Sequence, residues 1–414
     1  MKNRLIFFLD ETSLVFKNSF ANIIVVLLSS IIPIFIIPYL IAKLGIDAYG
    51  FYVFGLASVA LMAGVFDFGI SIWAGAYIAK KRSSIKKTFA SIFWIRILIF
   101  IITLPLFIFY SNSTLQYSEY SIEIMLFSFI LLSHLLKINW LFQGIQKIYF
   151  FSLINLLSQF IFLLLIFLFI DSSENLKYLI LFYFFSHVLN ILLSYTYAHK
   201  NNYLSFEINL NRIRNYLARS LHFFISRIFV SVYVNSGTVI IGLFSSPHII
   251  AIYSVAEQIF NGMKMIFSQF INAFIPYMSK NLNFKIYRYF LLFLILLIIS
   301  FSFFIFNLLD YLSIFFFDKI NYQYNSFMTL FLFALIVNIP GVFLGYPLMI
   351  PTNNSRIANN SVIFGSILFI ALVSISLIFN FFSASLLIIF LLFSETLVLL
   401  IRFFCAKKYL FGNF

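Results

Sequence analysis

Nine ionisable side chains lie within long apolar stretches of this 414-residue chain, where an isolated charge is costly. They are Asp67, Arg96, His134, Lys137, His187, Arg227, Glu257, Lys264 and Glu395. A charge at the centre of a hydrocarbon layer costs at least about 2.5 kcal/mol, so we expect these groups to face a hydrated interior or one another. The chemistry open to them is ion binding, proton exchange and the holding of a charged substrate.

Depth along the helix separates the buried cations. Arg96 lies nine residues beyond Lys87, and Arg227 lies eight beyond Arg219. At about 1.5 Å per residue, both are about 12 to 14 Å from the nearest helix end, which is too deep for comfortable contact with lipid headgroups. Lys137 is near the end of its apolar stretch, and we expect its long side chain to reach the headgroups.

Two pairs of opposite charge share a spacing of seven residues, which places both members on one helix face. They are Glu257 with Lys264, close to the polar Asn261, and Glu395 with Arg402. A polar stripe on an otherwise apolar helix predicts the wall of a cavity. The alternative is that these groups only make hydrogen bonds between neighbouring helices.

Asp67 belongs to the segment Asp67-Phe68-Gly69, with Gly64 and Gly75 nearby. Besides an ion-binding role, this composition is compatible with a tight helix contact or a local unwinding of the helix. For His134 and His187 we expect hydrogen bonds to neighbouring helices to satisfy the rings.

The composition requires an all-α integral membrane protein. The chain is 63% hydrophobic and 10% charged, with a mean hydropathy of +1.05, and its apolar runs are continuous, unlike those of a membrane β-barrel. The single Cys405 excludes a disulfide framework and a thiolate metal site. The chain has no phosphate-binding loop of a nucleotide hydrolase, so we expect no cofactor. We expect any energy-requiring step to be driven by a proton or sodium gradient. The net charge of +14 predicts loops facing anionic lipid and no nucleic-acid partner.

Apolar runs of spanning length predict twelve transmembrane helices. They cover 20–40, 49–79, 89–109, 122–142, 150–170, 178–198, 222–244, 249–277, 287–309, 327–350, 360–379 and 384–404. Alternate connections, with Arg288 and Arg402 at the span ends counted among them, carry 20 and 3 of the 27 Lys and Arg residues, and the other 4 lie inside the spans. The positive-inside rule therefore predicts a multi-pass protein with both termini in the cytoplasm.

A long basic connection divides the chain into two halves. We expect an N-terminal six-helix lobe over 1–198, a cytoplasmic linker over 199–221 and a C-terminal six-helix lobe over 222–414. Tyr77-Ile78-Ala79-Lys80 recurs as Tyr277-Met278-Ser279-Lys280 at the ends of spans two and eight. Because six spans separate the two copies, they run in the same membrane direction, as parallel repeats do.

The segment Asn139-Trp140-Leu141-Phe142-Gln143-Gly144-Ile145-Gln146-Lys147 resembles the Wzx-type polysaccharide flippases of the multidrug/oligosaccharidyl-lipid/polysaccharide (MOP) exporter superfamily. Leu44-Gly45 with Tyr49-Gly50, Asp67-Phe68-Gly69 and Ile252-Tyr253-Ser254-Val255-Ala256 are similar to further markers of that family. The Pro-rich end of span ten departs from it. The resemblance implies two six-helix lobes around a central cavity, alternating access, and an undecaprenyl-pyrophosphate-linked oligosaccharide flipped across the bacterial cytoplasmic membrane. Membrane lipids, a polysaccharide polymerase and a chain-length regulator are the implied partners.

Within that resemblance the buried charges receive roles. Arg227, Lys264 and Arg96 would bind the pyrophosphate, because buried cations attract phosphate oxygens. Asp67, Glu257 or Glu395 would exchange a proton or sodium ion. Two other functions stay open. A drug or cation exporter shares the expected fold, whereas an O-antigen polymerase would carry a large periplasmic loop, and the longest such connection here is about 310–326.

Overall fold

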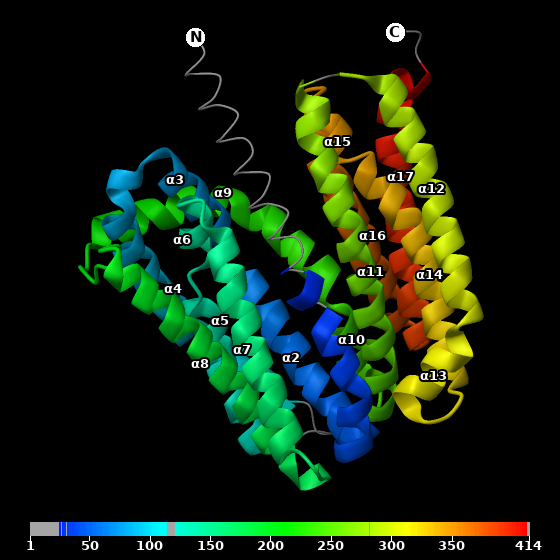
Figure 1. The fold of residues 1–414 in the computed structure, drawn as a ribbon, viewed down its shortest axis with the longest axis horizontal. Coiled ribbons are helices and arrows are strands. Elements are labelled where there is room, and N and C mark those ends of the chain that lie inside the picture. Colours follow the sequence, from blue (N-terminus) through cyan, green and yellow to red (C-terminus); the bar gives the residue numbers. More distant parts are fainter. Residues whose placement is uncertain (1–24, 26, 30, 114–120, 281, 412–414) are drawn as a thin grey trace. The chain divides into compact units, whose positions relative to one another are not determined.

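The computed structural model describes residues 25, 27–29, 31–113, 121–280 and 282–411, which form helices and, in this part of the chain, no strand (Figure 1). The all-α class is confirmed. The helices are α2 (Ile46–Phe66), α3 (Ile70–Lys80), α4 (Ile85–Ser113), α5 (Ser121–Leu136), α6 (Asn139–Gly144), α7 (Ile148–Phe169), α8 (Leu176–Lys200), α9 (Leu210–Asn235), α10 (Gly237–Phe244), α11 (Pro247–Lys280), α12 (Phe284–Asn307), α13 (Leu309–Phe317), α14 (Tyr322–Phe343), α15 (Tyr346–Met349), α16 (Ser355–Ile378) and α17 (Ala384–Phe411).

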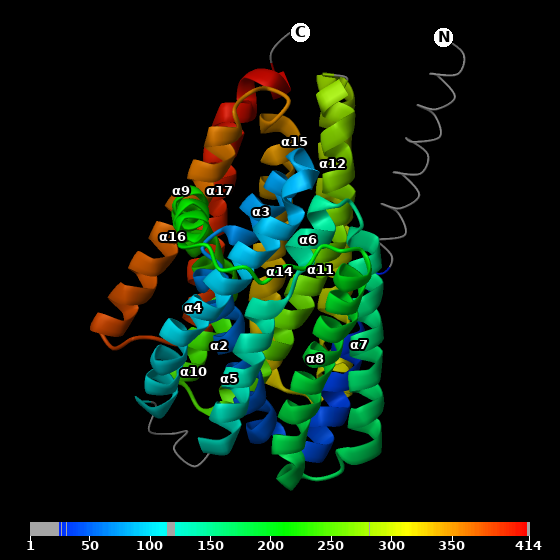
Figure 2. The same cartoon turned by 90° about the vertical axis from the view of Figure 1, so that its left-hand side faces the viewer.

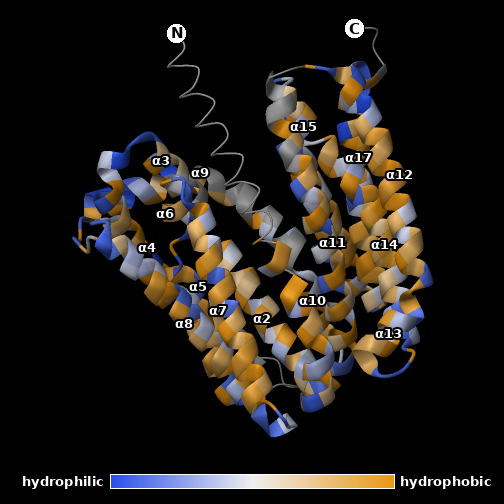
Figure 3. Cartoon of the chain, in the orientation of Figure 1, coloured by the Kyte–Doolittle hydropathy of each residue, from blue (hydrophilic) through white to orange (hydrophobic). Residues whose placement is uncertain are grey.

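Ten stretches among the described residues are long and apolar enough to cross a membrane, so the chain is a multi-pass membrane protein. They begin with Leu27–Leu44 and end with Ala384–Leu410. Apolar residues predominate along α12 and α14, while hydrophilic residues gather near the α13 end of these helices (Figure 3). Expected span seven corresponds to α9 and α10, and expected span eight corresponds to α11. Neither is among these ten apolar stretches.

The described residues form two compact units. The first comprises residues up to Ile36 and those from Met62 to Arg227, and the second comprises Ile37–Leu61 and the residues from Ile228 onward. The first contains α3 to α8, and the second contains α10 to α17. Helix α3 ends at Lys80 and α11 ends at Lys280, which are the matching lysines of the sequence repeat.

Four of the twelve expected spans are interrupted by a helix break. Span two divides into α2 and α3, span four into α5 and α6, span seven into α9 and α10, and span ten into α14 and α15. At the first break, Phe68 and Gly69 have positive φ angles of 51° and 69°. This is the left-handed region, which a right-handed helix cannot continue through. The local unwinding considered for Asp67-Phe68-Gly69 is thus confirmed.

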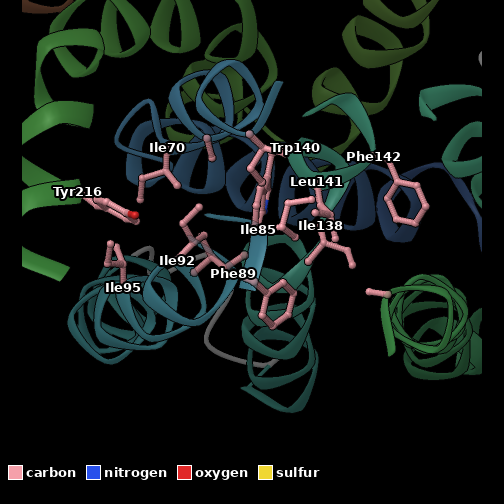
Figure 4. Packing of buried hydrophobic residues seen from close by; sticks show 14 of the residues in the cluster. Ile70, Ile85, Phe89, Ile92, Ile95, Ile138, Trp140, Leu141, Phe142 and Tyr216 are labelled. Atoms are coloured by element: carbon pink, nitrogen blue, oxygen red, sulfur yellow. The ribbon is translucent and has the colours of Figure 1, made fainter. Parts of the chain in front are cut away.

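The core of the first unit joins α3, α4 and α6 (Figure 4). Trp140, Leu141 and Phe142 are almost completely buried in it. The next small residue of that segment, Gly144, packs on α3: an added Cβ would lie 2.8 Å from Ile78 Cβ and 3.0 Å from Gly75 O. The segment that carries the family resemblance therefore fixes α6 against α3.

The basic connection after α8 is also packed on the first unit. Residues 203–209 are not helical, and the Trp94 Nε1–H donates a hydrogen bond of 2.9 Å to Phe206 O. At the start of α9, Ile213 and Tyr216 are buried in the same core. Helix α8 lies beside α5 and α7 (Figure 2).

Helix α14 is the centre of the second unit and packs against α11, α12 and α17. The Tyr287 ring of α12 stacks on Phe343 with centroids 4.4 Å apart, and its hydroxyl donates to Phe343 O at 2.7 Å. The part of α2 in this unit meets α11 at Gly50, where an added Cβ would lie 2.0 Å from Pro247 O. Gly50 thus allows the two backbones to touch.

Candidate functional site

A partly buried carboxylate lies at the helix break between α9 and α10. Glu257 of α11 accepts a hydrogen bond from the Thr238 hydroxyl through Oε2, and from the Tyr253 hydroxyl through Oε1 at 3.5 Å. Thr238 is the second residue of α10. The amino-terminal end of a helix carries partial positive charge, so α10 is oriented to stabilise the negative charge of Glu257.

Gly237 permits this approach. A Cβ added to it would lie 2.3 Å from Glu257 Oε1 and 2.5 Å from the Tyr253 hydroxyl. No side chain fits in that space, so the carboxylate can reach the start of α10 only because residue 237 is glycine.

The carboxylate opens on a small cavity of about 20 Å³. One water molecule needs about 10 to 15 Å³ by the same measure, so the cavity holds a water or a small cation and is too small for a pyrophosphate. It is lined by Tyr233, Gly237, Tyr253, Glu257, Phe260, Asn261, Lys264, Phe331, Phe369, Leu387 and Leu391.

Lys264 contributes a positive charge to the wall of this cavity, with Nζ 4.8 Å from the centre of the Phe260 ring. The prediction that Glu257 and Lys264 face one cavity is therefore confirmed. Their ionic roles stay predictions. No sequence pattern points to Thr238 or Gly237. Tyr253 belongs to a segment that resembles the family, and its position four residues before Glu257 on the same helix face is the signal that could have placed it at this site.

In the first unit, Arg96 joins two helix breaks. Its Nη2 lies 3.3 Å from Asp67 Oδ1 and donates to Ser71 Oγ at 3.0 Å, at the break between α2 and α3. Its Nη1 donates to Leu135 O at 2.6 Å and to Lys137 O, at the break between α5 and α6. These carbonyls have lost their helical partners, so Arg96 replaces the missing backbone donors.

Arg402 makes the corresponding connection in the second unit. Its Nη1 donates to Gly341 O at 2.7 Å near the end of α14, and its Nη2 donates to Ala358 O at 3.1 Å in the first turn of α16. Its Nε donates to Ser361 Oγ at 2.9 Å. Glu395, seven residues earlier on the same helix, is 5% exposed. Arg402 is 6% exposed, so its assignment to the cations of the connections is wrong.

The side chain of Arg227 lies outside the described residues, so its substrate role stays a prediction. The expectation for Lys137 was wrong: its Nζ lies 3.4 Å from His187 Nε2, between α5 and α8, and is not directed to headgroups. The expectation that His187 is satisfied by a neighbouring helix is confirmed by its 2.8 Å contact with Ser133 Oγ.

The fold is that of the MOP superfamily transporters. The structure described as "Lipid II flippase MurJ, inward closed conformation" matches with a TM-score of 0.67 and 13% identity, covering 95% of this chain and 87% of that one. An inward-facing multidrug resistance MATE family transporter of the MOP superfamily matches with a TM-score of 0.64 and 12% identity, covering 94% of each chain. At these identities the likeness concerns the fold alone.

The family described as "Polysaccharide biosynthesis protein" matches residues 15–282, and the chain belongs to this family. A relative from Escherichia coli (strain K12), named "Putative O-antigen transporter", is 27% identical over 260 residues. That alignment covers 61% of this chain and 62% of the relative, so the chain matches less than two thirds of the relative's length.

Proposed function

We propose that the protein is a secondary transporter, not an enzyme, that flips undecaprenyl-pyrophosphate-linked oligosaccharide repeat units of O-antigen or a similar surface polysaccharide. The observation that carries the proposal is the polysaccharide biosynthesis family match over 15–282 in a chain with a MOP transporter fold. The name of the Escherichia coli relative supports the same substrate class.

Lys264 and Arg227 are the proposed contacts of the pyrophosphate. Lys264 lies at a cavity wall with its ammonium group over the Phe260 ring, so it is available to bind phosphate oxygens once the cavity widens. Arg96 is also a candidate. In this structure its guanidinium already serves protein groups, so substrate contact would require at least one of these hydrogen bonds to open.

Glu257 is the proposed coupling residue, and Asp67 and Glu395 are the further candidates. The Glu257 carboxylate adjoins a cavity of the size of a single water or small cation. Binding of a proton or sodium ion there would cancel the negative charge that Thr238 and the start of α10 now stabilise. That change would act directly on the break between α9 and α10. No cofactor is needed for this cycle.

We place the protein in the bacterial cytoplasmic membrane with both termini in the cytoplasm, as the distribution of Lys and Arg supports. A polysaccharide polymerase and a chain-length regulator would use the flipped repeat units on the opposite side. Membrane lipids surround the many exposed apolar side chains of the described helices.

The test is deletion of the gene in its host, followed by labelling of lipid-linked repeat units in each leaflet. Accumulation in the cytoplasmic leaflet supports flipping. Single repeat units on the cell surface would instead identify a polymerase, and unchanged glycan with raised drug sensitivity would identify a drug exporter.

Complementation with variants then tests the site. Lys264→Met and Glu257→Gln should each reduce surface polysaccharide at least about tenfold at equal expression, the effect of about 1.4 kcal/mol. Exposed positions supply matched controls: Lys285→Met and Glu174→Gln should complement fully. Full complementation by both site variants would remove this cavity from the mechanism.

A further inference from the structure

A second group of titratable side chains lies inside the first unit, away from Glu257. It consists of Lys137 and His134 from the α5 side and His187 from α8. The His134 and His187 ring centroids are 4.6 Å apart, and Lys137 Nζ is 3.4 Å from His187 Nε2. Among the described residues, none of the three forms an ion pair with a carboxylate.

The hydrogen bonds define the proton position on His187. The Ser133 hydroxyl donates its only proton to Ile130 O at 2.6 Å. This geometry leaves its oxygen to accept from His187 Nδ1, which is 2.8 Å away, and on this ground we assign the proton of neutral His187 to Nδ1. With a proton on Nδ1, neutral His187 presents the lone pair of Nε2 to Lys137 Nζ.

We propose that Lys137 and His187 together form a one-proton binding site. A single proton is shared between Lys137 Nζ and His187 Nε2, since a second would place two cations 3.4 Å apart in a membrane interior. Release of this proton leaves a neutral amine and a neutral imidazole. The group thus changes between a charge of +1 and zero without any carboxylate.

A polar stripe on α8 provides a path for the proton. Tyr183, His187, Asn190, Ser194 and Tyr197 follow one another at spacings of four, three, four and three residues, which places them on one helix face. The stripe ends at Tyr197, whose ring centre is 5.5 Å from Lys147 Nζ at the start of α7.

The middle of this stripe requires water. Asn190 and Ser194 are each 1% exposed, and within the described part of the chain the Asn190 amide and the Ser194 hydroxyl find no hydrogen-bond partner. Buried polar groups are almost always satisfied, and ordered water commonly supplies the partner. Water held by these two side chains would connect His187 to the helix end.

The remaining neighbours add no charge that would neutralise the site. The Tyr183 ring is 4.6 Å from that of His187, and the Tyr195 hydroxyl donates to Leu136 O at 3.2 Å. Helix α7, which packs on α8, contains no charged residue. From α4, Arg96 faces Lys137 O, but its charge is balanced by Asp67.

The site is located where a change in charge can affect structure. Lys137 is itself the residue at the break between α5 and α6, and its carbonyl is held by Arg96. Gain or loss of the proton therefore changes the charge at a helix break. Its consequence for transport rests on the proposed function, whereas proton binding does not.

The experiment is nuclear magnetic resonance of the full chain in nanodiscs with ¹⁵N-labelled histidine. The chain has 5 histidines, and His187→Gln assigns the signal of interest. We expect neutral His187 to carry its proton on Nδ1 and, in the wild-type chain, to gain no second proton while the pair holds the shared one. In Lys137→Met no cation opposes protonation of His187, so its protonation midpoint should lie at least about one pH unit higher than in the wild type.

The matched control is His199→Gln, at an exposed position on the same helix, which should leave the His187 titration unchanged. A proton on Nε2 of neutral His187, or the same midpoint in wild type and Lys137→Met, would overturn the proposal. The position of the proton on neutral His187 is read from the wild-type chain. This part of the test therefore holds even if the Lys137→Met variant does not fold. The experiment measures proton binding without a transport substrate. Its outcome therefore does not depend on the proposed transport function, and failure of one is distinguishable from failure of the other.

Discussion

Replacement of Arg96 by Met should destabilise the protein by about 3 to 5 kcal/mol, the cost of removing one partner of a buried ion pair. The Arg96 side chain is 6% exposed and that of Asp67 is 14% exposed, so water cannot replace the lost charge easily. The variant also leaves Leu135 O and Lys137 O without their donor. We therefore expect a value near the upper end of that range.

The free energy of unfolding in mixed micelles titrated with sodium dodecyl sulfate measures this effect. Lys86→Met removes an exposed cation from the same helix and should change stability by less than about 0.5 kcal/mol. Adding Asp67→Asn to Arg96→Met should recover about 1 kcal/mol or more, because it removes the unpaired carboxylate.

This measurement separates two roles for Arg96. A residue that only binds substrate can be replaced without loss of stability, whereas one that joins two helix breaks cannot. If Arg96→Met unfolds at the same detergent fraction as Lys86→Met, the structural role inferred from its four hydrogen bonds is wrong.

Three further substitutions follow from the same reasoning and use the same unfolding assay. Gly237→Ala should cost about 1 to 3 kcal/mol and abolish ion dependence of transport, because the new Cβ would lie 2.3 Å from Glu257 Oε1; unchanged ion dependence would contradict this site geometry. Gly144→Ala should cost a similar amount through its 2.8 Å approach to Ile78, and wild-type stability would show that α3 and α6 can separate at no cost. Arg402→Met should cost about 1 to 3 kcal/mol by leaving Gly341 O without its side-chain donor, whereas Ala358 O keeps the Ser361 hydroxyl, and a cost below about 0.5 kcal/mol would show that another group satisfies Gly341 O.

The sequence predicts the membrane helices well because apolar runs of about 20 residues have few alternatives to a spanning helix. It also places Glu257 and Lys264 on one cavity, because a spacing of seven residues returns to the same helix face. These features depend only on local sequence, so no knowledge of the tertiary structure is needed.

The helix breaks and the partners of the buried charges are less accessible to such reasoning. The averaged hydropathy stays high across the break at Lys137, because the break lies within one apolar stretch, Ile122–Gly144. The carbonyls that Arg96 and Arg402 satisfy belong to segments distant in the sequence. The position of Gly237 against Glu257 likewise arises from contact between α10 and α11. Residues whose roles depend on a partner distant in sequence were therefore missed or assigned differently.

The most direct test of the central claim is transport by the purified protein in proteoliposomes that contain an undecaprenyl-pyrophosphate-linked repeat unit in one leaflet. A membrane-impermeant glycosidase or lectin then reports the fraction exposed in the other leaflet. We predict protein-dependent exposure that increases with an imposed proton or sodium gradient and falls at least about tenfold in Glu257→Gln. Exposure no faster than in protein-free liposomes, under any gradient, would contradict the proposed function.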